Sequence, residues 1–355
     1  MNESDPAGLL KFGPGKWQIR ISWDGNKEFK GGSVVVDVNM VDGREESKVV
    51  LKEGVSFTYN MDVNVMKNAI YDSVIDWDNS ALPAKDTLTL EDFVIEYEAN
   101  LQDIETGVEL PKIPGMPEAD LGSKWVPIEG KKYQIGDTVL GQYPQIGAGE
   151  QKLRVKYVGN AEYRPSEVIE GAVKVEKASV KGQVKNISQY ADKPFSAEGF
   201  VTTNPADKFD IYTISAGVTS NVTTIVYLNL PDRYQNETFL KILDPVVKEI
   251  FGKTFSQMMN DGMNLGELRK LLSSQELLDL LKKLNIDTGT FGQILTVINK
   301  LPAVTDNVAV AFGYPSRAGM YMVTAVTDNK NYNTGVGVGT ILLKMRHSGS
   351  KLAWN

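Results

Sequence analysis

The pattern of hydrophobic and polar positions predicts a chain built largely from β-strands. At residues 17–23, 153–157 and 321–325, apolar side chains alternate with other residues, and this period of two is typical of a strand with one buried face. Each run leads into a turn rich in Asp, Asn or Gly, residues that tolerate a positive φ angle. A second strand-like run follows each turn. The sequence therefore predicts three β-hairpins.

The three predicted hairpins share one order of residues, which indicates an internal repeat. Each begins at a glycine, passes through the alternating positions and the turn, and reaches an aromatic residue that we expect to cover the end of a core. These segments are residues 15–29, 149–163 and 319–332, and their aromatic residues are Phe29, Tyr163 and Tyr332. The second strands are expected at residues 33–40, 170–178 and 335–345.

This shared pattern resembles the closing hairpin of bacterial immunoglobulin-like (Big-type) domains, which are repeated in surface proteins of Gram-positive bacteria. The resemblance covers only the hairpin of each copy. It implies tandem Ig-like β-sandwich domains that each end at their hairpin. The implied domains are residues 1–43, 44–178 and 179–346, with residues 347–355 as a tail or the start of a further domain. Residues 1–43 would then be the closing hairpin of a truncated domain, cut from a longer array.

The spacing of the hairpins predicts two extra segments, because an Ig-type sandwich needs only about 100 residues. In the middle domain the extra segment is residues 100–132, where several prolines oppose regular ladders and favour a long loop or a partly extended arm. In the last domain it is residues 232–301, where leucines at helical spacing predict about four or five short helices. The expected fold is mainly β, with tandem Ig-like sandwiches and an α-helical bundle inserted into the last one (α+β overall).

Several boundary signals support the predicted helices. Asn236 is expected to cap the first helix, Asp244 followed by Pro245 to begin another, and Gly252 to end it. Capping boxes are expected at Thr254 with Gln257, at Ser273 with Glu276 and at Thr290 with Gln293.

Alternating glycines near the end of the chain predict a close contact. Gly335, Gly337 and Gly339 share one face of an expected strand. A strand face without side chains lets another element approach its backbone, and the helical segment is the first candidate for that element.

Composition argues against several classes of function. The 355 residues include no Cys and one His, His347, which removes thiolate and multi-His metal sites and argues against a Ser-His-Asp triad. A formal net charge of −7 argues against nucleic-acid binding. No apolar run reaches the roughly 18 residues of a membrane span. We therefore expect a protein that is not an enzyme, holds no cofactor and is not embedded in a membrane.

Two weaker candidate sites come from acidic and aromatic residues. Asp72, Asp76 and Asp78 offer oxygen ligands for calcium, but their segment lacks the Gly and the distal Glu of a helix-loop-helix calcium loop. A solvated turn is the favoured interpretation, so no metal is expected. Trp17, Trp23, Trp77 and Trp125 could stack on a sugar, although core or domain-junction positions suit three of them better.

The resemblance and the helical segment together favour a non-catalytic binding module of a bacterial surface protein. Its Ig-like domains would present the helical segment to a host protein, with an immunoglobulin as the first choice, outside the cell. The alternatives are a purely structural spacer or stalk, and a carbohydrate-binding adhesin module that contacts a glycan. Neighbouring Ig-like domains of the same longer chain are the other expected partners. The candidate contact residues are Tyr234, Phe239, Phe251, Phe255, Met258, Met259 and Met263, of which the methionines suit adaptable surfaces and also core filling.

Overall fold

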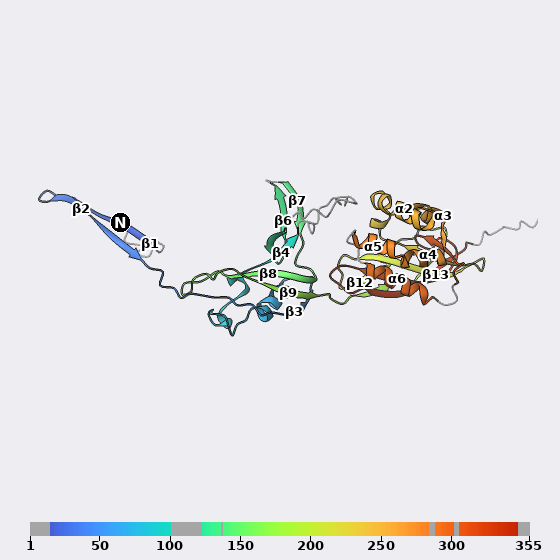
Figure 1. Cartoon of the computed structure of the whole chain (residues 1–355), viewed down its shortest axis with the longest axis horizontal. Helices are drawn as coiled ribbons and strands as arrows, with labels where there is room; N and C mark the ends of the chain where they lie inside the picture. Colours follow the sequence, from blue (N-terminus) through green and yellow to red (C-terminus); the bar gives the residue numbers. More distant parts are fainter. Residues whose placement is uncertain (1–14, 101–122, 136–137, 284–287, 302–304, 347–355) are drawn as a thin grey trace, which may run out of the picture. The chain divides into compact units, whose positions relative to one another are not determined.

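The computed structural model describes residues 15–100, 123–135, 138–283, 288–301 and 305–346 (Figure 1). The described chain is mainly β and contains the α-helices α1 to α6. It divides into two compact units. The first comprises the described parts of residues 1–52, 75–95 and 154–170, and the second those of residues 53–74, 96–153 and 171–355. The assignment to Ig-like sandwiches and the domain boundaries expected from the sequence stay predictions.

All three predicted hairpin segments form neighbouring strands. The pairs are β1 (Gly15–Gly25) with β2 (Lys30–Met40), β8 (Gly149–Tyr157) with β9 (Ile169–Glu176), and β17 (Gly319–Asp328) with β18 (Gly335–Lys344). An asparagine holds each turn through its side chain. Asn26 and Asn160 accept hydrogen bonds from the amides two and three residues later, and Asn329 accepts one from the amide of Asn331. These contacts are local, which explains why the turns were predictable from sequence.

The second hairpin belongs to a five-stranded sheet. The strand order is β3 (Ser56–Thr58), β9, β8, β4 (Phe93–Asn100) and β5 (Ser123–Pro127). Along β4, residues alternate between buried and more exposed, so one face of the strand lies in a core. A separate two-stranded sheet joins β6 (Lys131–Ile135) and β7 (Thr138–Tyr143). The remaining elements before β6 are α1 (Val63–Ala69), the π-helix Ile70–Val74 and the 3-10 turns Lys85–Thr87 and Leu90–Asp92.

The last part of the segment predicted at residues 100–132 as a long loop or a partly extended arm forms strands in place of a loop. Residues 101–122 lie outside the described residues. The chain then forms β5, in which Trp125 pairs with Glu98 and Val126 pairs with Tyr97 on β4. Val126 is fully buried, so its side chain and the backbone hydrogen bonds of the ladder stabilise the strand. Pro127, which was expected to oppose a strand, is the last residue of β5, where a proline is tolerated.

The third hairpin belongs to a seven-stranded sheet with different neighbours on its two faces. The strand order is β11 (Ile187–Tyr190), β18, β17, β13 (Asp210–Thr219), β14 (Thr224–Asn229), β16 (Ala309–Phe312) and β15 (Met263–Asn264). Because side chains alternate along a strand, β14 sends Val226 and Leu228 into one core cluster and Ile225 and Tyr227 into another. The first cluster contains the side chains of the helices, so the helices cover one face of this sheet.

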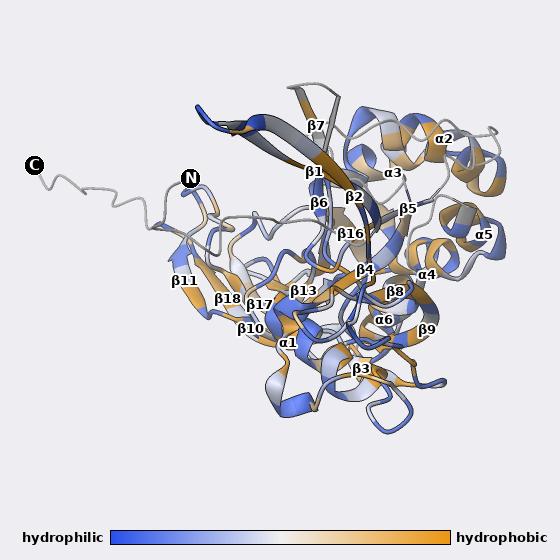
Figure 2. Cartoon of the chain, turned by 90° about the vertical axis from the view of Figure 1, so that its left-hand side faces the viewer, coloured by the Kyte–Doolittle hydropathy of each residue, from blue (hydrophilic) through white to orange (hydrophobic). Residues whose placement is uncertain are grey.

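The described residues of the helical segment form five helices, which agrees with the four or five predicted. They are α2 (Glu237–Phe251), α3 (Phe255–Asp261), α4 (Leu265–Ser273), α5 (Gln275–Lys283) and α6 (Thr288–Asn299), after a 3-10 turn at Asp232–Tyr234. In Figure 2, α2, α4 and α5 each carry hydrophobic residues on one side and hydrophilic residues on another. We call α2 to α6 the helical layer.

Three of the predicted helix boundaries are confirmed. The side chain of Asn236 accepts a hydrogen bond from the amide of Phe239 and caps α2. Gly252 ends α2 with φ 74°. Thr254 and Gln257 form the expected capping box of α3.

Three other boundary predictions are wrong. Pro245 lies inside α2, and Asp244 contacts α3 instead of beginning a helix. Ser274, one residue after Ser273, accepts the amide of Leu277 at the start of α5. Thr290 lies inside α6 and is buried. In each case a short polar residue fits the local pattern of a cap, and packing decides where the helix begins.

The predicted close contact at the alternating glycines forms, but with a different element. Gly335, Gly337 and Gly339 of β18 face the β10 segment (β10, Lys181–Val184), not the helical layer. β10 pairs with β12 (Val201–Asn204) in a separate two-stranded sheet. The first candidate from the sequence was therefore wrong, because the glycines lie on the strand face away from the helices.

Candidate functional site

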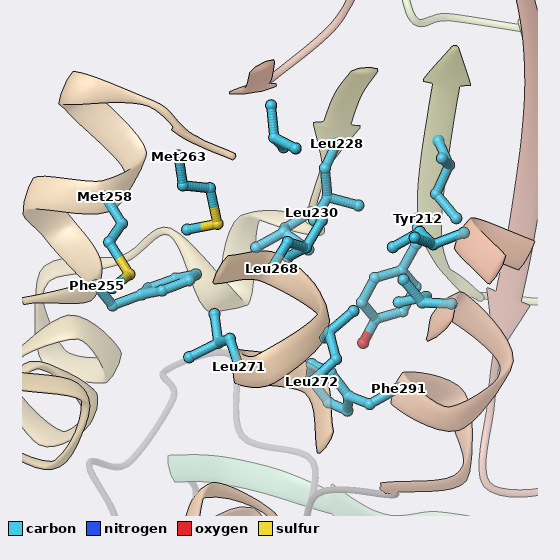
Figure 3. Packing of buried hydrophobic residues seen from close by; sticks show 14 of the residues in the cluster. Tyr212, Leu228, Leu230, Phe255, Met258, Met263, Leu268, Leu271, Leu272 and Phe291 are labelled. Atoms are coloured by element: carbon cyan, nitrogen blue, oxygen red, sulfur yellow. The ribbon is translucent and has the colours of Figure 1, made fainter. Parts of the chain in front are cut away.

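The seven residues expected to contact a partner lie in or against the core of the helical layer. Tyr234, Phe255, Met258 and Met263 are buried, and Phe239, Phe251 and Met259 are partly buried hydrophobic residues packed against the same cluster. Figure 3 shows Phe255, Met258 and Met263 pointing into the cluster with Leu268 and Leu271. These side chains stabilise the helices against the sheet, and as placed they offer little surface to a partner.

The outer surface of the helical layer is polar. Within the described residues of 232–301, no large hydrophobic side chain is exposed. The outward positions carry charged or amide side chains, such as Lys248, Gln257, Lys270 and Glu276. An apolar helix face for docking, with anchors at i, i+3, i+4 and i+7, is therefore not present on the described helices.

An exposed apolar surface lies instead on the seven-stranded sheet, across β13, β17 and β18. The register places Val218 opposite Met320, and Met320 opposite Leu342, so these three side chains form one row across three strands. We call the exposed apolar residues of this face the sheet patch. Its members are Val218, Met320, Met322, Val336, Val338 and Leu342, with exposed fractions of 40–64%.

The sheet patch lies on the strand face that the helical layer covers elsewhere. Ala216, which alternates with Val218 on the same face of β13, packs against the core cluster of the helices. Val326 and Thr324 are on the same face of β17 as Met320 and Met322, and both are buried. The helices therefore cover part of this face and leave the row of Val218 and the length of β18 open.

Polar residues border the sheet patch at β11. The amide and hydroxyl of Thr340 donate to the side chain of Asn186, at 2.9 and 3.1 Å. The Arg346 guanidinium lies over the ring of Tyr190 and pairs with Asp192 at 2.8 Å. An apolar centre with a polar and charged border is the usual composition of a protein interface.

The sequence of β17 shows one sign of the sheet patch, which is that apolar residues lie on both faces of the strand. In β17 the inward residues Tyr321 and Val323 alternate with Met320 and Met322, so both faces are apolar. Such a strand is expected to be covered on both sides. The exposure of one side becomes visible only when the covering elements are placed.

The acidic candidates do not gather into a metal site. Asp76 accepts a hydrogen bond from the amide side chain of Asn79 at 2.8 Å, which lowers the pKa of the Asp76 carboxyl. Asp72 lies in the π-helix, and Asp78 lies in the turn that follows it. Over the described stretches of the chain, no three His, Cys, Asp or Glu side chains are close enough together to hold a metal ion.

The tryptophans fall into two environments. Trp77 packs edge-on against Phe93 with ring centroids 5.9 Å apart, and Lys85 lies over its ring. Trp17 and Trp23 are 38% and 50% exposed on one face of β1. Their side chains are separated by Ile19 and Ile21 along the strand, so they do not form an adjacent pair for one sugar ring.

Two linker segments are held by the turns of later hairpins. After β2, the amide of Glu45 donates a hydrogen bond to the carbonyl of Glu162 at 2.7 Å. The carbonyl of Glu45 accepts a hydrogen bond from the amide of Arg164 at 2.8 Å. After β9, Ala178 makes the same two bonds with Asn331 and Asn333, at 3.0 and 2.8 Å. Both are one-residue parallel bridges, to Tyr163 and Tyr332. We call them the first and second linker anchors.

A network of charges strengthens the first linker anchor. The Asp42 carboxylate pairs with Arg44 at 2.9 Å and lies 3.5 Å from the Nε of Arg164. Hydrogen bonds from Arg44 lower the pKa of Asp42 to about 2. The Glu45 carboxylate raises the pKa of the Tyr163 hydroxyl above its ordinary value. The linker is therefore tied to the turn by backbone and side-chain groups together.

No model of a known protein family matches the sequence, and no curated protein matches it either. Among the described residues, no helix is long and apolar enough to cross a membrane.

Proposed function

We propose that this chain is a non-catalytic binding module of a bacterial surface protein, acting outside the cell, and that the sheet patch contacts the partner. The partner we propose is a host protein, with an immunoglobulin as the first one to test. The seven-stranded sheet holds the patch in position, and the helical layer packs against the same face of that sheet.

The observation that carries this proposal is the exposure of the sheet patch. Six Val, Leu and Met side chains are exposed on three neighbouring strands of one sheet. A contiguous exposed apolar surface with a polar border is typical of a protein-interaction site. The two methionines, Met320 and Met322, are flexible and can adapt to a partner surface.

The test compares the chain with a variant of the patch, Met320→Thr with Val338→Thr. We expect the Kd for a purified partner to rise about tenfold or more, because burying one such side chain contributes about 1.5–3 kcal/mol. A matched control is Val158→Thr with Val168→Thr, which makes a similar change at valines 41% and 48% exposed elsewhere. Surface plasmon resonance against immunoglobulin classes and purified serum and mucosal proteins gives the affinities.

A third variant tests whether the partner contacts the helical layer instead of the sheet patch. Lys248→Glu with Lys270→Glu reverses two exposed charges on α2 and α4. Binding that is lost in this variant and kept in the patch variant would move the contact surface to the helices. Deleting the whole helical layer is not a usable control, because the deletion would uncover Tyr212, Val226 and Leu228 of the sheet core.

A structural spacer is the second candidate function, and the two linker anchors favour it. Anchored linkers restrict how a chain of successive domains can bend, which is what a stalk requires. A spacer binds nothing through the sheet patch, so in that case the patch variant and its control would behave alike with every protein tested.

A further inference from the structure

The two linker anchors use one type of receptor, the turn of a closing hairpin. In each, the carbonyl before an aromatic residue accepts a hydrogen bond, and the amide after it donates one. The linker contributes both groups from a single residue, Glu45 or Ala178. The contact is made by backbone atoms, so it depends on the shape of the turn more than on the sequence of the linker.

The turn between β1 and β2 has a matching backbone geometry and a similar sequence, with the same Gly, Asn and Glu. Residues 25–30 read GNKEFK, and residues 159–164 read GNAEYR. Gly25 and Gly159 have φ angles of 82° and 81°. The amides of Asn26 and Asn160 donate to the carbonyls of Phe29 and Tyr163 at 2.9 and 3.0 Å. The two turns therefore correspond position by position, with different residues at three of the six positions.

In the first turn, no other described residue makes a backbone hydrogen bond to the two groups that receive a linker, the Glu28 carbonyl and the Lys30 amide. The register pairs Gly25 with Lys30, and the bond from the Asn26 amide to the Phe29 carbonyl makes this a non-hydrogen-bonded pair, so the Lys30 amide points away from β1. Phe29 is 64% exposed, whereas the equivalent Tyr332 is 3% exposed beside its linker. In the two occupied turns, the matching amides belong to Arg164 and Asn333.

We propose that the turn at residues 25–30 is a receptor for an extended, acidic linker segment from another module of this kind. One residue of that linker forms a parallel bridge to Phe29 through the Glu28 carbonyl and the Lys30 amide. The charge of the linker follows from the first linker anchor, where Asp42, three residues before Glu45, lies beside Arg164. In the turn at residues 25–30, Lys30 occupies the position that Arg164 has in the turn at residues 159–164. A linker carboxylate three residues before the bridging residue, as Asp42 is, would therefore lie beside a cation in each of these two turns.

The first test transplants the receptor within the full chain. The variant Ala161→Lys with Tyr163→Phe and Arg164→Lys converts the second turn into the sequence of the first. A competent receptor keeps the amide of Glu45 as protected from hydrogen exchange as in the unchanged chain, measured by NMR. Asn160→Ala, which removes the bonds that shape the turn, is the control and is expected to speed this exchange about tenfold. If the Glu45 amide exchanges as fast in the transplant variant as in the Asn160→Ala control, the proposal is overturned.

The second test supplies a linker to the first turn. The eight residues 41–48, VDGREESK, are fused ahead of Met1, so that the 14 residues before β1 connect them to the hairpin. An extended chain of that length reaches about 48 Å, more than the roughly 36 Å length of β1. A parallel bridge at the turn also directs the peptide toward the start of β1, where the connection joins.

In the fusion we expect the hydrogen-exchange rate of the Lys30 amide to fall about tenfold. We also expect the Phe29 side chain to become less exposed to solvent. A fusion with the same eight residues in scrambled order is the matched control. A third fusion replaces the Asp of the peptide by Asn and is expected to protect Lys30 less than the original. Equal exchange of Lys30 in the native and scrambled fusions overturns the proposal, independently of whether the sheet patch binds a protein.

Discussion

Gly337 of β18 lies directly against Gly182 of β10, with so little space that a Cβ atom on Gly337 would lie 2.8 Å from the carbonyl carbon of Gly182. The flanking glycines of β18 repeat this closeness. A Cβ on Gly335 would lie 2.9 Å from a methyl carbon of Val180, and one on Gly339 would lie 2.6 Å from a methyl carbon of Val184. Alternating glycines therefore let the β10 segment pack against the backbone of β18.

The first prediction is that Gly337→Ala destabilises the chain. The added methyl group must push β10 away from β18, because the contacted atoms are backbone and cannot rotate aside. We expect the free energy of unfolding to fall by about 1–3 kcal/mol, the usual effect of overpacking a core. Val338→Ala changes the neighbouring residue on the exposed face and should cost much less. Equal urea-unfolding midpoints for the two variants would contradict the close packing.

The second prediction concerns the contact between α2 and α3. The Asp244 carboxylate of α2 accepts hydrogen bonds from the amide and the hydroxyl of Ser256, at 2.8 and 2.6 Å. We expect Asp244→Ala to lower the free energy of unfolding by about 1–2 kcal/mol, as loss of a capping carboxylate does. Ser256→Ala removes one of the two bonds and should cost less. A double-mutant cycle in urea should show coupling between the two sites, and fully additive effects would show that the contact contributes nothing.

The third prediction is the acid sensitivity of the first linker anchor. Hydrogen bonds from Arg44 hold the pKa of Asp42 at about 2, below its ordinary value of 3.8. A lowered pKa in the folded state means that the contribution of Asp42 is present above pH 3.8 and is lost as the pH falls through about 2. We therefore expect hydrogen exchange at the Glu45 amide, corrected for its intrinsic pH dependence, to lose protection in that window.

Asp42→Asn is the control for this pH dependence. The amide cannot ionise, so the protection of Glu45 in this variant should be lower at neutral pH and nearly constant on acidification. A variant that loses protection in the same pH window as the unchanged chain would show that another group titrates.

The fourth prediction is alkaline destabilisation through Tyr321. The Tyr321 hydroxyl donates to the carbonyl of Arg317 at 2.8 Å, and burial raises its pKa from 10.0 to about 12. Because the folded-state pKa is raised, the contribution of the protonated hydroxyl is complete below pH 10 and is lost as the pH rises through about 12. Tyr321→Phe should reduce the slope of unfolding free energy against pH in that interval. An unchanged slope would assign the alkaline loss to other groups, such as Tyr332, whose pKa burial also raises.

The local elements followed from the sequence because their causes are local. A period of two marked β1, β8 and β17, and the amides that hold each turn lie within three residues of its asparagine. The helix ends at Asn236, Gly252 and Thr254 were predictable for the same reason. The failed boundaries at Asp244 and Thr290 show the limit, since a short polar residue can equally bond to a distant helix or be buried.

Residue types alone could not separate the core from the candidate contact surface. Met258 and Met320 are both methionines in regular elements, and one is 2% exposed while the other is 64% exposed. The difference arises because α3 packs Met258 into the core cluster beneath the helices, whereas Met320 lies at the start of β17, on the part of the strand face that stays exposed. The sequence by itself determined the repeated hairpins, their turns and the helical segment, through interactions between residues a few positions apart. Only the tertiary structure decided that β10 fills the glycine face, that the predicted contact residues lie in or against the core and that part of one sheet face stays open. The reason is that burial depends on which segments distant in sequence pack together.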